Sequence, residues 1–299
     1  MSVSDSYNIL ARLGEQKRRK FGELFLAEHK ETREKVVIKI VSKTPTNRQI
    51  ALRLSQEALF SFQFKGLPKI LAFEDLHNKV ILIREYIDGI SLDAFWNGLK
   101  RKHRIPFIKK LMQQLNSILQ ELERQRIVHC DIKPSNIIIG DQGKSIHLID
   151  FGLALNTDKQ EKRTILFPLG YAAPELLLNH LDLVRSSTDI YALGIVFWRL
   201  FAGKLPLTHA NPSIFTNLQL TYPLPYDRSI PKQLFPIIQK MTVKHQFQIP
   251  PNKMGKSEVK ELLQSAIEKR YQNSIDLTED LEQIRTKRRI LPKNIFSKP

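Results

Sequence analysis

A short segment of the chain, 129–136 (His-Cys-Asp-Ile-Lys-Pro-Ser-Asn), contains side chains that could hold a metal ion and a phosphate group. Asp131 and Asn136 are five positions apart, Lys133 lies between them, and Pro134 restricts the backbone. Carboxylate and amide oxygens can ligate Mg²⁺, and an ammonium group neutralises phosphate charge. Phosphoryl transfer depends on positioning and charge neutralisation more than on covalent chemistry, so the segment predicts a site for this reaction.

Two further groups complete the set of charges that phosphoryl transfer needs. Asp150, followed by Phe and Gly, comes fourteen residues after Asn136 and just after an apolar run, where its carboxylate could face a metal ion. Lys39 ends the strand-like run Val-Val-Ile-Lys, and Glu57 in the following helical segment could form an ion pair with it. The sequence therefore predicts a lysine anchored by a glutamate, together with oxygen ligands for a metal ion.

The elements that must position these side chains divide the chain into a β-rich first part and a helical second part. Periodicity predicts strands over 7–13, 23–27, 35–41 and 79–87 and a helix over 47–64. Asp88 and Gly89 then break the pattern and indicate a hinge. Beyond them we expect helices over 106–126, 186–201, 257–272 and 276–285, short strands over 137–139 and 146–149, and a loop over 247–255.

The order of these motifs resembles that of the eukaryotic-type Ser/Thr protein kinase family, including its bacterial members, over residues 7–285. Later matches are Ala173-Pro174-Glu175, Asp189, which braces the catalytic loop in the family, and Arg270, which pairs with the glutamate. The resemblance implies an α+β, two-lobed protein-kinase-like fold with a small β-rich N-lobe and a large helical C-lobe. The expected boundaries are 1–87 for the N-lobe, 88–288 for the C-lobe and 289–299 for a basic C-terminal tail.

The resemblance also implies a role for each residue of the predicted site. Asp131 resembles the catalytic base that orients the acceptor hydroxyl, and Lys133 resembles the contact to the γ-phosphate. Asn136 and Asp150 resemble the magnesium ligands, so the expected cofactors are ATP and Mg²⁺. The implied enzyme is an ATP-dependent Ser/Thr protein kinase, a phosphotransferase that moves the γ-phosphoryl group of ATP to a protein hydroxyl.

The part of the resemblance that concerns ATP lies in the expected N-lobe and the hinge. Lys39 resembles the anchor of the ATP phosphates, and the segment 82–89 resembles the hinge that hydrogen-bonds adenine through its backbone. Gly14 and Gly22 match the two ends of a glycine loop that covers the phosphates. The residues expected to bind ATP are Lys39, Glu57, Gly14, Gly22, Leu24, Glu85 and Ile87.

Three departures from the family pattern leave a second function open. The glycine loop is longer than the pattern, lacks the middle glycine and contains the basic cluster 17–20. Arg84 stands at the gatekeeper position, where an uncharged side chain is usual, and the segment 167–171 lacks the usual threonine. The first alternative is therefore a pseudokinase that acts as an ATP-binding scaffold module. The second is a kinase of small molecules or of a nucleic-acid-bound target.

Cys130 replaces the arginine that usually precedes the catalytic base in the family. That arginine is normally neutralised by a phosphorylated activation loop. Its absence implies that activity does not depend on phosphorylation of this loop, where Thr157 and Thr164 are the residues to test.

The composition limits the class of protein and its partners. The 299 residues carry a net charge of +17, with 47 Lys and Arg, including the basic clusters 17–20 and 285–289, against 30 Asp and Glu. Such a charge attracts polyanions, which leaves ATP, an acidic protein substrate, nucleic acid and an anionic membrane surface open as partners. The single cysteine excludes an intrachain disulfide. Without an apolar run of eighteen residues or a signal-peptide pattern, we expect a cytoplasmic protein with no transmembrane segment.

Overall fold

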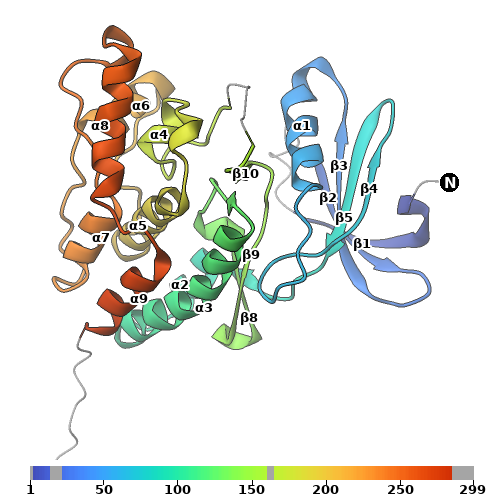
Figure 1. Ribbon diagram of the computed structural model, residues 1–299. Coiled ribbons are helices and arrows are strands. Elements are labelled where there is room, and N and C mark those ends of the chain that lie inside the picture. Colours follow the sequence, from blue (N-terminus) through green and yellow to red (C-terminus); the bar gives the residue numbers. More distant parts are fainter. Residues whose placement is uncertain (1–2, 14–21, 160–164, 285–299) are drawn as a thin grey trace, which may run out of the picture.

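The structure, a computed structural model, describes residues 3–13, 22–159 and 165–284. Figure 1 shows two lobes, the first built on a five-stranded sheet and the second mainly helical. This arrangement confirms the expected two-lobed α+β fold. Several features singled out in the sequence lie outside the described residues: Gly14, the basic clusters 17–20 and 285–289, Thr164 and the tail 289–299.

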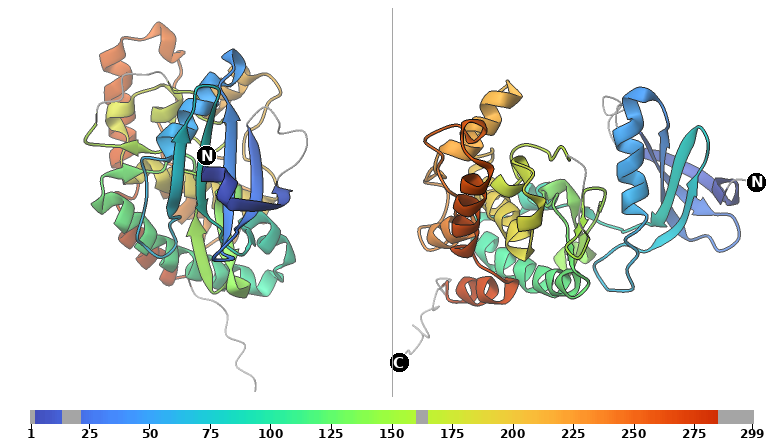
Figure 2. Two further views of the ribbon diagram at one scale, coloured as in Figure 1. Left: turned by 90° about the vertical axis from the view of Figure 1, so that its right-hand side faces the viewer. Right: turned by 45° about the horizontal axis from the view of Figure 1, so that its top comes forward.

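The N-lobe sheet is antiparallel, with its strands in the order β1-β2-β3-β5-β4. The strands are β1 (Tyr7–Leu13), β2 (Glu23–His29), β3 (Lys35–Ser42), β4 (Ile70–Asp75) and β5 (Lys79–Glu85). Helix α1 (Arg48–Glu57) lies along one face of this sheet (Figure 2). The buried side chains at the contact are Ala51, Leu54, Val41, Val80 and Leu82. This apolar contact fixes α1 against β3, and so sets the positions of Glu57 and Lys39 relative to each other.

The expected helix over 47–64 is wrong in its second half, because α1 ends at Glu57. Phe62 fits the helical spacing, but Phe60 and Phe62 instead pack on the ring of Phe151, with ring centroids 6.2 and 4.7 Å from it. A distant aromatic contact therefore overrides the local pattern. Strand β4 is not among the expected strands, because its alternation of half-buried and exposed residues is the weak signal of an edge strand.

The C-lobe surrounds a helix, α5, that is buried along most of its length and lies among the other helices in Figure 1. The helices are α2 (Leu92–Gly98), α3 (Arg104–Arg124), α4 (Pro174–Leu177), α5 (Ser186–Ala202), α6 (Pro212–Thr221), α7 (Phe235–Met241), α8 (Lys256–Glu268) and α9 (Ser274–Glu282). The short strands are β6 (Ile90–Ser91), β7 (Ile127–Val128), β8 (Ile137–Gly140), β9 (Ser145–Leu148) and β10 (Leu155–Asn156). The helices and strands expected here are confirmed to within four residues at each end. None of the helices in the described ranges combines the length and hydropathy that a membrane span requires.

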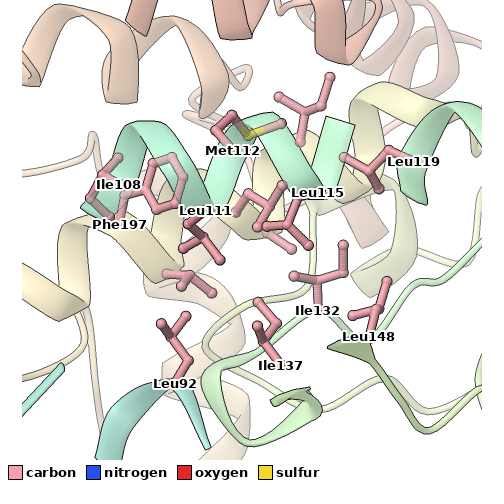
Figure 3. Close-up of a cluster of buried hydrophobic side chains, with 14 of the residues drawn as sticks. Leu92, Ile108, Leu111, Met112, Leu115, Leu119, Ile132, Ile137, Leu148 and Phe197 are labelled. Atoms are coloured by element: carbon pink, nitrogen blue, oxygen red, sulfur yellow. The ribbon is translucent and has the colours of Figure 1, made fainter. Parts of the chain in front are cut away.

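The core of the C-lobe forms where α3 faces the hairpin of β8 and β9, as Figure 3 shows. Ile132 lies in this cluster with 0% of its surface exposed, beside Leu115 and Leu148. Burial of a side chain of this size contributes about 1.5–3 kcal/mol. Because Ile132 stands between Asp131 and Lys133, its burial anchors the backbone that carries both polar side chains.

Candidate active site

A two-stranded hairpin brings Asn136 and Asp150 to the same end of the C-lobe. Strands β8 and β9 are antiparallel, and Ile137 pairs with Leu148. The pairing continues one step further, because the Ile149 N–H donates to the Asn136 carbonyl at 2.9 Å. Asn136 precedes the first strand and Asp150 follows the second, so the hairpin places the two expected magnesium ligands side by side.

The carboxylate of Asp131 is held by two polar side chains of its own segment. Lys133 Nζ lies 2.6 Å from Asp131 Oδ2, and Asn136 Nδ2 donates to the same oxygen at 3.1 Å. The other oxygen, Oδ1, is buried and has no hydrogen-bond partner among the described residues. Burial raises the pKa of Asp131, and the Lys133 ammonium opposes this shift. The two oxygens of the carboxylate therefore differ, because Lys133 and Asn136 both contact Oδ2 and leave Oδ1 without a partner among the described residues.

The ring of His129 connects this segment to the end of β9. Burial lowers the pKa of His129, so the ring is neutral at neutral pH. Its Nδ1 accepts from the Asp131 N–H at 3.2 Å, which requires that Nε2 carries the proton and donates to the Ile149 carbonyl at 3.1 Å. A single ring therefore ties the backbone of Asp131 to the residue before Asp150.

Asp189, in the first turn of α5, braces the same segment. Its two carboxylate oxygens accept from the N–H of His129 at 2.8 Å and of Cys130 at 2.9 Å. Cys130 has φ 62°, a left-handed conformation that is uncommon for residues other than glycine. These two hydrogen bonds give both backbone N–H groups of the strained turn an acceptor. The contact expected between Asp189 and this segment is therefore present.

A buried ion pair joins α4 to the chain just beyond α8. Arg270 donates to the two Glu175 oxygens at 2.7 and 3.0 Å, and both side chains have 0% of their surface exposed. Thr188 of α5 donates to Glu175 at 2.9 Å. The contact predicted between Glu175 and Arg270 is therefore present, and it fixes the end of the segment that begins at Asp150.

Lys39 links the two lobes through its ammonium group. Nζ lies 2.6 and 2.8 Å from the Glu57 oxygens and 3.4 Å from Asp150 Oδ1. The Lys39 charge is the main reason that the pKa of Asp150 is lowered, so this carboxylate is ionised at neutral pH. Burial of Lys39 favours the neutral amine, but Asp150 and Glu57 outweigh burial and raise the pKa of Lys39. The Lys39 ammonium group of β3 therefore contacts both the end of α1 and the turn that follows β9.

Phe151 points into the protein, whereas the neighbouring Asp150 stays accessible. The Phe151 ring is buried, with its centroid 4.7 Å from those of Phe62 and His129. The Asp150 side chain is 43% exposed, and its φ of 72° is in the left-handed region. Such a conformation costs free energy in a residue other than glycine, and strained residues of this kind cluster at functional sites. The strained turn separates the buried ring from the carboxylate that could bind a metal ion.

The residues expected to cover the ATP phosphates lie at the start of the N-lobe sheet. Leu24 of β2 pairs with Lys39 of β3, so the two side chains share a face of the sheet. Gly22 has φ 91°, and an added Cβ would lie 2.7 Å from the Val41 side chain, so this position requires glycine. The role expected of Gly14 stays a prediction, because this residue lies outside the described residues.

Glu85 and Ile87 lie where β5 leads into the C-lobe. The Glu85 side chain accepts from the Lys69 N–H at 3.0 Å, and the Glu85 N–H donates to the Lys69 carbonyl at 3.0 Å. The Glu85 carbonyl accepts from Arg84 Nη1 at 3.0 Å. The Glu85 side chain therefore stabilises the connection, and contacts to a nucleotide base are left to the backbone.

The donor set at the site matches the coordination that Mg²⁺ prefers with a nucleotide. The described residues contain no group of three or more His, Cys, Asp and Glu side chains that could hold a metal ion. Mg²⁺ usually takes only one or two carboxylates and completes its shell with phosphates and water. Asp150 supplies an accessible ionised carboxylate and Asn136 an amide oxygen, so the pair fits Mg²⁺ that enters with a nucleotide.

The segment 150–175 is called the activation segment below. Two residues that were not among the expected site residues contact it. Arg53 Nη2 of α1 donates to the Leu166 carbonyl at 2.5 Å, and Gln219 of α6 accepts from the Gly170 N–H at 3.2 Å. Arg53 is four residues before Glu57 and so shares its helix face, a spacing that could have indicated it. Gln219 has no comparable signal, because its partner is 49 residues away in the chain.

These contacts define the class of protein. An ion-paired lysine, a base segment braced by α5 and an Asp-Phe-Gly turn, arranged on two lobes, are the parts of a protein kinase domain. The chain belongs to the protein kinase domain family, which it matches over residues 7–283. The match covers all of the expected site residues.

The relatives of the chain are Ser/Thr protein kinases. Rat serine/threonine-protein kinase D2 is 28% identical over 191 residues, which cover 62% of this chain and 22% of that protein. The probable serine/threonine-protein kinase KIN1 homolog of Enterocytozoon bieneusi is 31% identical over 237 residues (77% and 39%). Serine/threonine-protein kinase PrkC of Bacillus subtilis is 29% identical over 255 residues (82% and 38%). The chain spans less than two fifths of these proteins, and the resemblance to Ser/Thr kinases, including a bacterial one, is confirmed.

Proposed function

We propose that the chain transfers the γ-phosphoryl group of ATP to a Ser or Thr hydroxyl of a protein. The observation that carries this proposal is the position of Lys39 Nζ, 2.6 Å from Glu57 and 3.4 Å from Asp150. In protein kinases this ion pair and the aspartate at the metal must both be in place for transfer. Here both contacts form together, so the charges needed for transfer are already assembled.

The nucleotide end of the site has two tasks in this proposal. Lys39, held by Glu57, neutralises the ATP phosphates, and the connection after Glu85 takes the base. Asn136 and Asp150 would hold Mg²⁺, which would neutralise negative charge on the phosphates. The low pKa of Asp150 supports this role, because the carboxylate stays ionised without a metal ion.

The acceptor end of the site depends on Asp131 and Lys133. The Asp131 carboxylate, whose Oδ1 has no hydrogen-bond partner among the described residues, accepts the hydrogen bond of the substrate hydroxyl. It takes the proton as the P–O bond to the substrate forms and the P–O bond to the ADP leaving group breaks. Lys133 lies 2.6 Å from the other oxygen, so its charge is close to the atoms that react. It stabilises the negative charge on the transferred group. The net charge of +17 supports an acidic protein as the substrate.

A pseudokinase is the second candidate, and the buried Arg84 favours it. A cation with 6% exposure behind the nucleotide site takes up space that the base could use. In that case the chain would bind a partner protein, with or without ATP, and transfer nothing. The intact contacts of Lys39 and Asp131 oppose this candidate.

A transfer assay separates the two candidates. The full chain is incubated with γ-labelled ATP, Mg²⁺ and either an acidic or a basic generic protein, and mass spectrometry locates the label. We expect phosphoserine and phosphothreonine, mainly in the acidic protein, and at least a hundredfold less label with Asp150→Ala, about the loss of one transition-state charge contact.

Two results would contradict active transfer by this chain. Equal labelling by wild type and Asp150→Ala would show that a contaminant produces the label. Tight ATP binding without any labelled product would establish the pseudokinase. Predominant labelling of the basic protein would contradict the proposal that the substrate is acidic, but not the proposal that the chain transfers phosphate.

The activation segment is held by contacts that need no phosphate. Cys130, where an arginine is usual, is 4% exposed in an apolar cluster with residues of this segment. Its neighbours there include Leu153, Leu155, Phe167 and Ala172. Arg53 adds a hydrogen bond from α1 to the Leu166 carbonyl. The contacts of Cys130 are apolar, and the Arg53 guanidinium already donates to a backbone carbonyl. Because neither contact needs a phosphate group, we propose that activity does not require phosphorylation of the segment.

Removal of the candidate phosphorylation sites should leave the transfer rate unchanged. Thr157 is exposed and donates to the Arg126 carbonyl through its N–H at 2.8 Å and its hydroxyl at 3.3 Å, while Thr164 lies outside the described residues. The double variant Thr157→Ala, Thr164→Ala is compared with wild type before and after phosphatase treatment. A complete loss of transfer in the folded double variant would refute phosphate-independent activity.

A further inference from the structure

Arg84 lies on the sheet face that carries the phosphate-binding lysine. Arg84 pairs with Val37 of β3, and Leu82, two residues earlier, pairs with Lys39. Paired residues share a face, and so do alternate residues of one strand. The Arg84 and Lys39 side chains therefore lie on the same face, and Arg84 is nearer to the connection between the lobes.

The guanidinium of Arg84 is buried but incompletely paired. The residue is 6% exposed, Nη1 donates to the Glu85 carbonyl at 3.0 Å, and Nε is buried without a hydrogen-bond partner among the described residues. Burial lowers the pKa of Arg84, while the charges of Glu57 and Asp150 oppose this shift. A guanidinium keeps its proton under such conditions. The inner end of the site thus contains a cation with an unused donor.

This cation changes what a nucleotide base would meet at the end of β5. A guanidinium offers only donors, and Arg84 already donates to the Glu85 carbonyl. A purine with an amino group at position 6 brings a donor to this place, whereas one with an oxo group brings an acceptor. We propose that Arg84 selects the nucleotide by favouring 6-oxopurines, so that the chain accepts GTP as a phosphoryl donor alongside ATP. The inference rests on the proposed function, because it concerns the same nucleotide site.

The expected effect is a change in relative affinity and not an exclusion of ATP. The Glu85 carbonyl has a second lone pair, which can still accept from an amino group. Arginine is the side chain that pairs most often with the oxo group and N7 of guanine. A buried donor that finds no acceptor discriminates against the ligand that leaves it unpaired. Arg84 should therefore raise the affinity for GTP relative to ATP.

The test measures the dissociation constants of ATP and GTP, each with Mg²⁺, by calorimetry on the full chain. Arg84→Met keeps the length of the side chain and removes its donors, and Arg84→Lys keeps the charge but loses the planar fork. We expect the ratio of the GTP to the ATP dissociation constant to rise about tenfold in Arg84→Met, and to rise in Arg84→Lys as well. Arg124→Met, which removes a cation that is 70% exposed on α3, should leave the ratio unchanged.

The outcomes distinguish this inference from the proposed function. If both nucleotides bind and the ratio is the same in wild type and both Arg84 variants, the selection by Arg84 is wrong and the kinase function stands. If wild type binds neither ATP nor GTP, both the selection by Arg84 and the proposed kinase function are wrong. Thermal unfolding of the nucleotide-free proteins shows which variants are folded, and Arg84→Lys decides the question if Arg84→Met does not fold.

Discussion

Replacement of Asp131 by Asn should reduce the rate of phosphoryl transfer by about 10²–10⁴-fold, the usual contribution of a positioned general base. The amide keeps the shape of the carboxylate and an oxygen that Lys133 can contact, but it cannot take the proton of the substrate hydroxyl. Nucleotide binding depends on Lys39 and Asp150, whose contacts do not involve Asp131. The loss should therefore appear in kcat, with the affinity for ATP unchanged.

The pH dependence of the rate gives a second readout for Asp131. Burial raises the pKa of this carboxyl, and only its ionised form can accept a proton. The wild-type rate should therefore rise with pH through a pKa above the usual range of an aspartate, and Asp131→Asn should lack this limb. Asp75→Asn, at a site on β4 that is 52% exposed, is the matched control and should keep the wild-type rate and profile. A wild-type rate in Asp131→Asn would exclude a role as base.

The part of the site that the sequence predicts depends on contacts between residues in the same segment or in neighbouring elements of the chain. Asp131, Lys133 and Asn136 lie within one turn-rich segment, and a single hairpin brings Asp150 beside Asn136. The contact between Lys39 and Glu57 requires only that one helix packs on the strand before it. In such cases the spacing along the chain already fixes the geometry.

The features that the sequence does not predict depend on contacts between distant segments. The end of α1 at Glu57 is set by Phe62, which packs on Phe151, 89 positions later. Helical periodicity cannot register this competition, because Phe62 also fits the helix. Arg84 is recognisable in the sequence as an unusual cation, but its burial and its bond to the Glu85 carbonyl appear only in the fold.

Replacement of Arg270 by Met should lower the free energy of unfolding by about 3–5 kcal/mol, because it leaves the Glu175 carboxylate buried without its counter-charge. The two side chains are fully buried, and Thr188 would be the remaining side-chain partner of Glu175, at 2.9 Å. The double variant Glu175→Gln, Arg270→Met removes both charges. It should be more stable than Arg270→Met alone, since no uncompensated charge stays in the core.

Thermal and denaturant unfolding measure this difference directly. For a chain of this size, the loss in Arg270→Met corresponds to a fall in Tm of about 5–8 °C. Lys260→Met breaks the ion pair with Asp182, whose 2.6 Å distance is similar but whose side chains are 47% and 54% exposed. This control should cost less than about 1 kcal/mol, because solvent screens the pair. Equal losses in Arg270→Met and Lys260→Met would show that the buried pair does not hold the activation segment to the C-lobe.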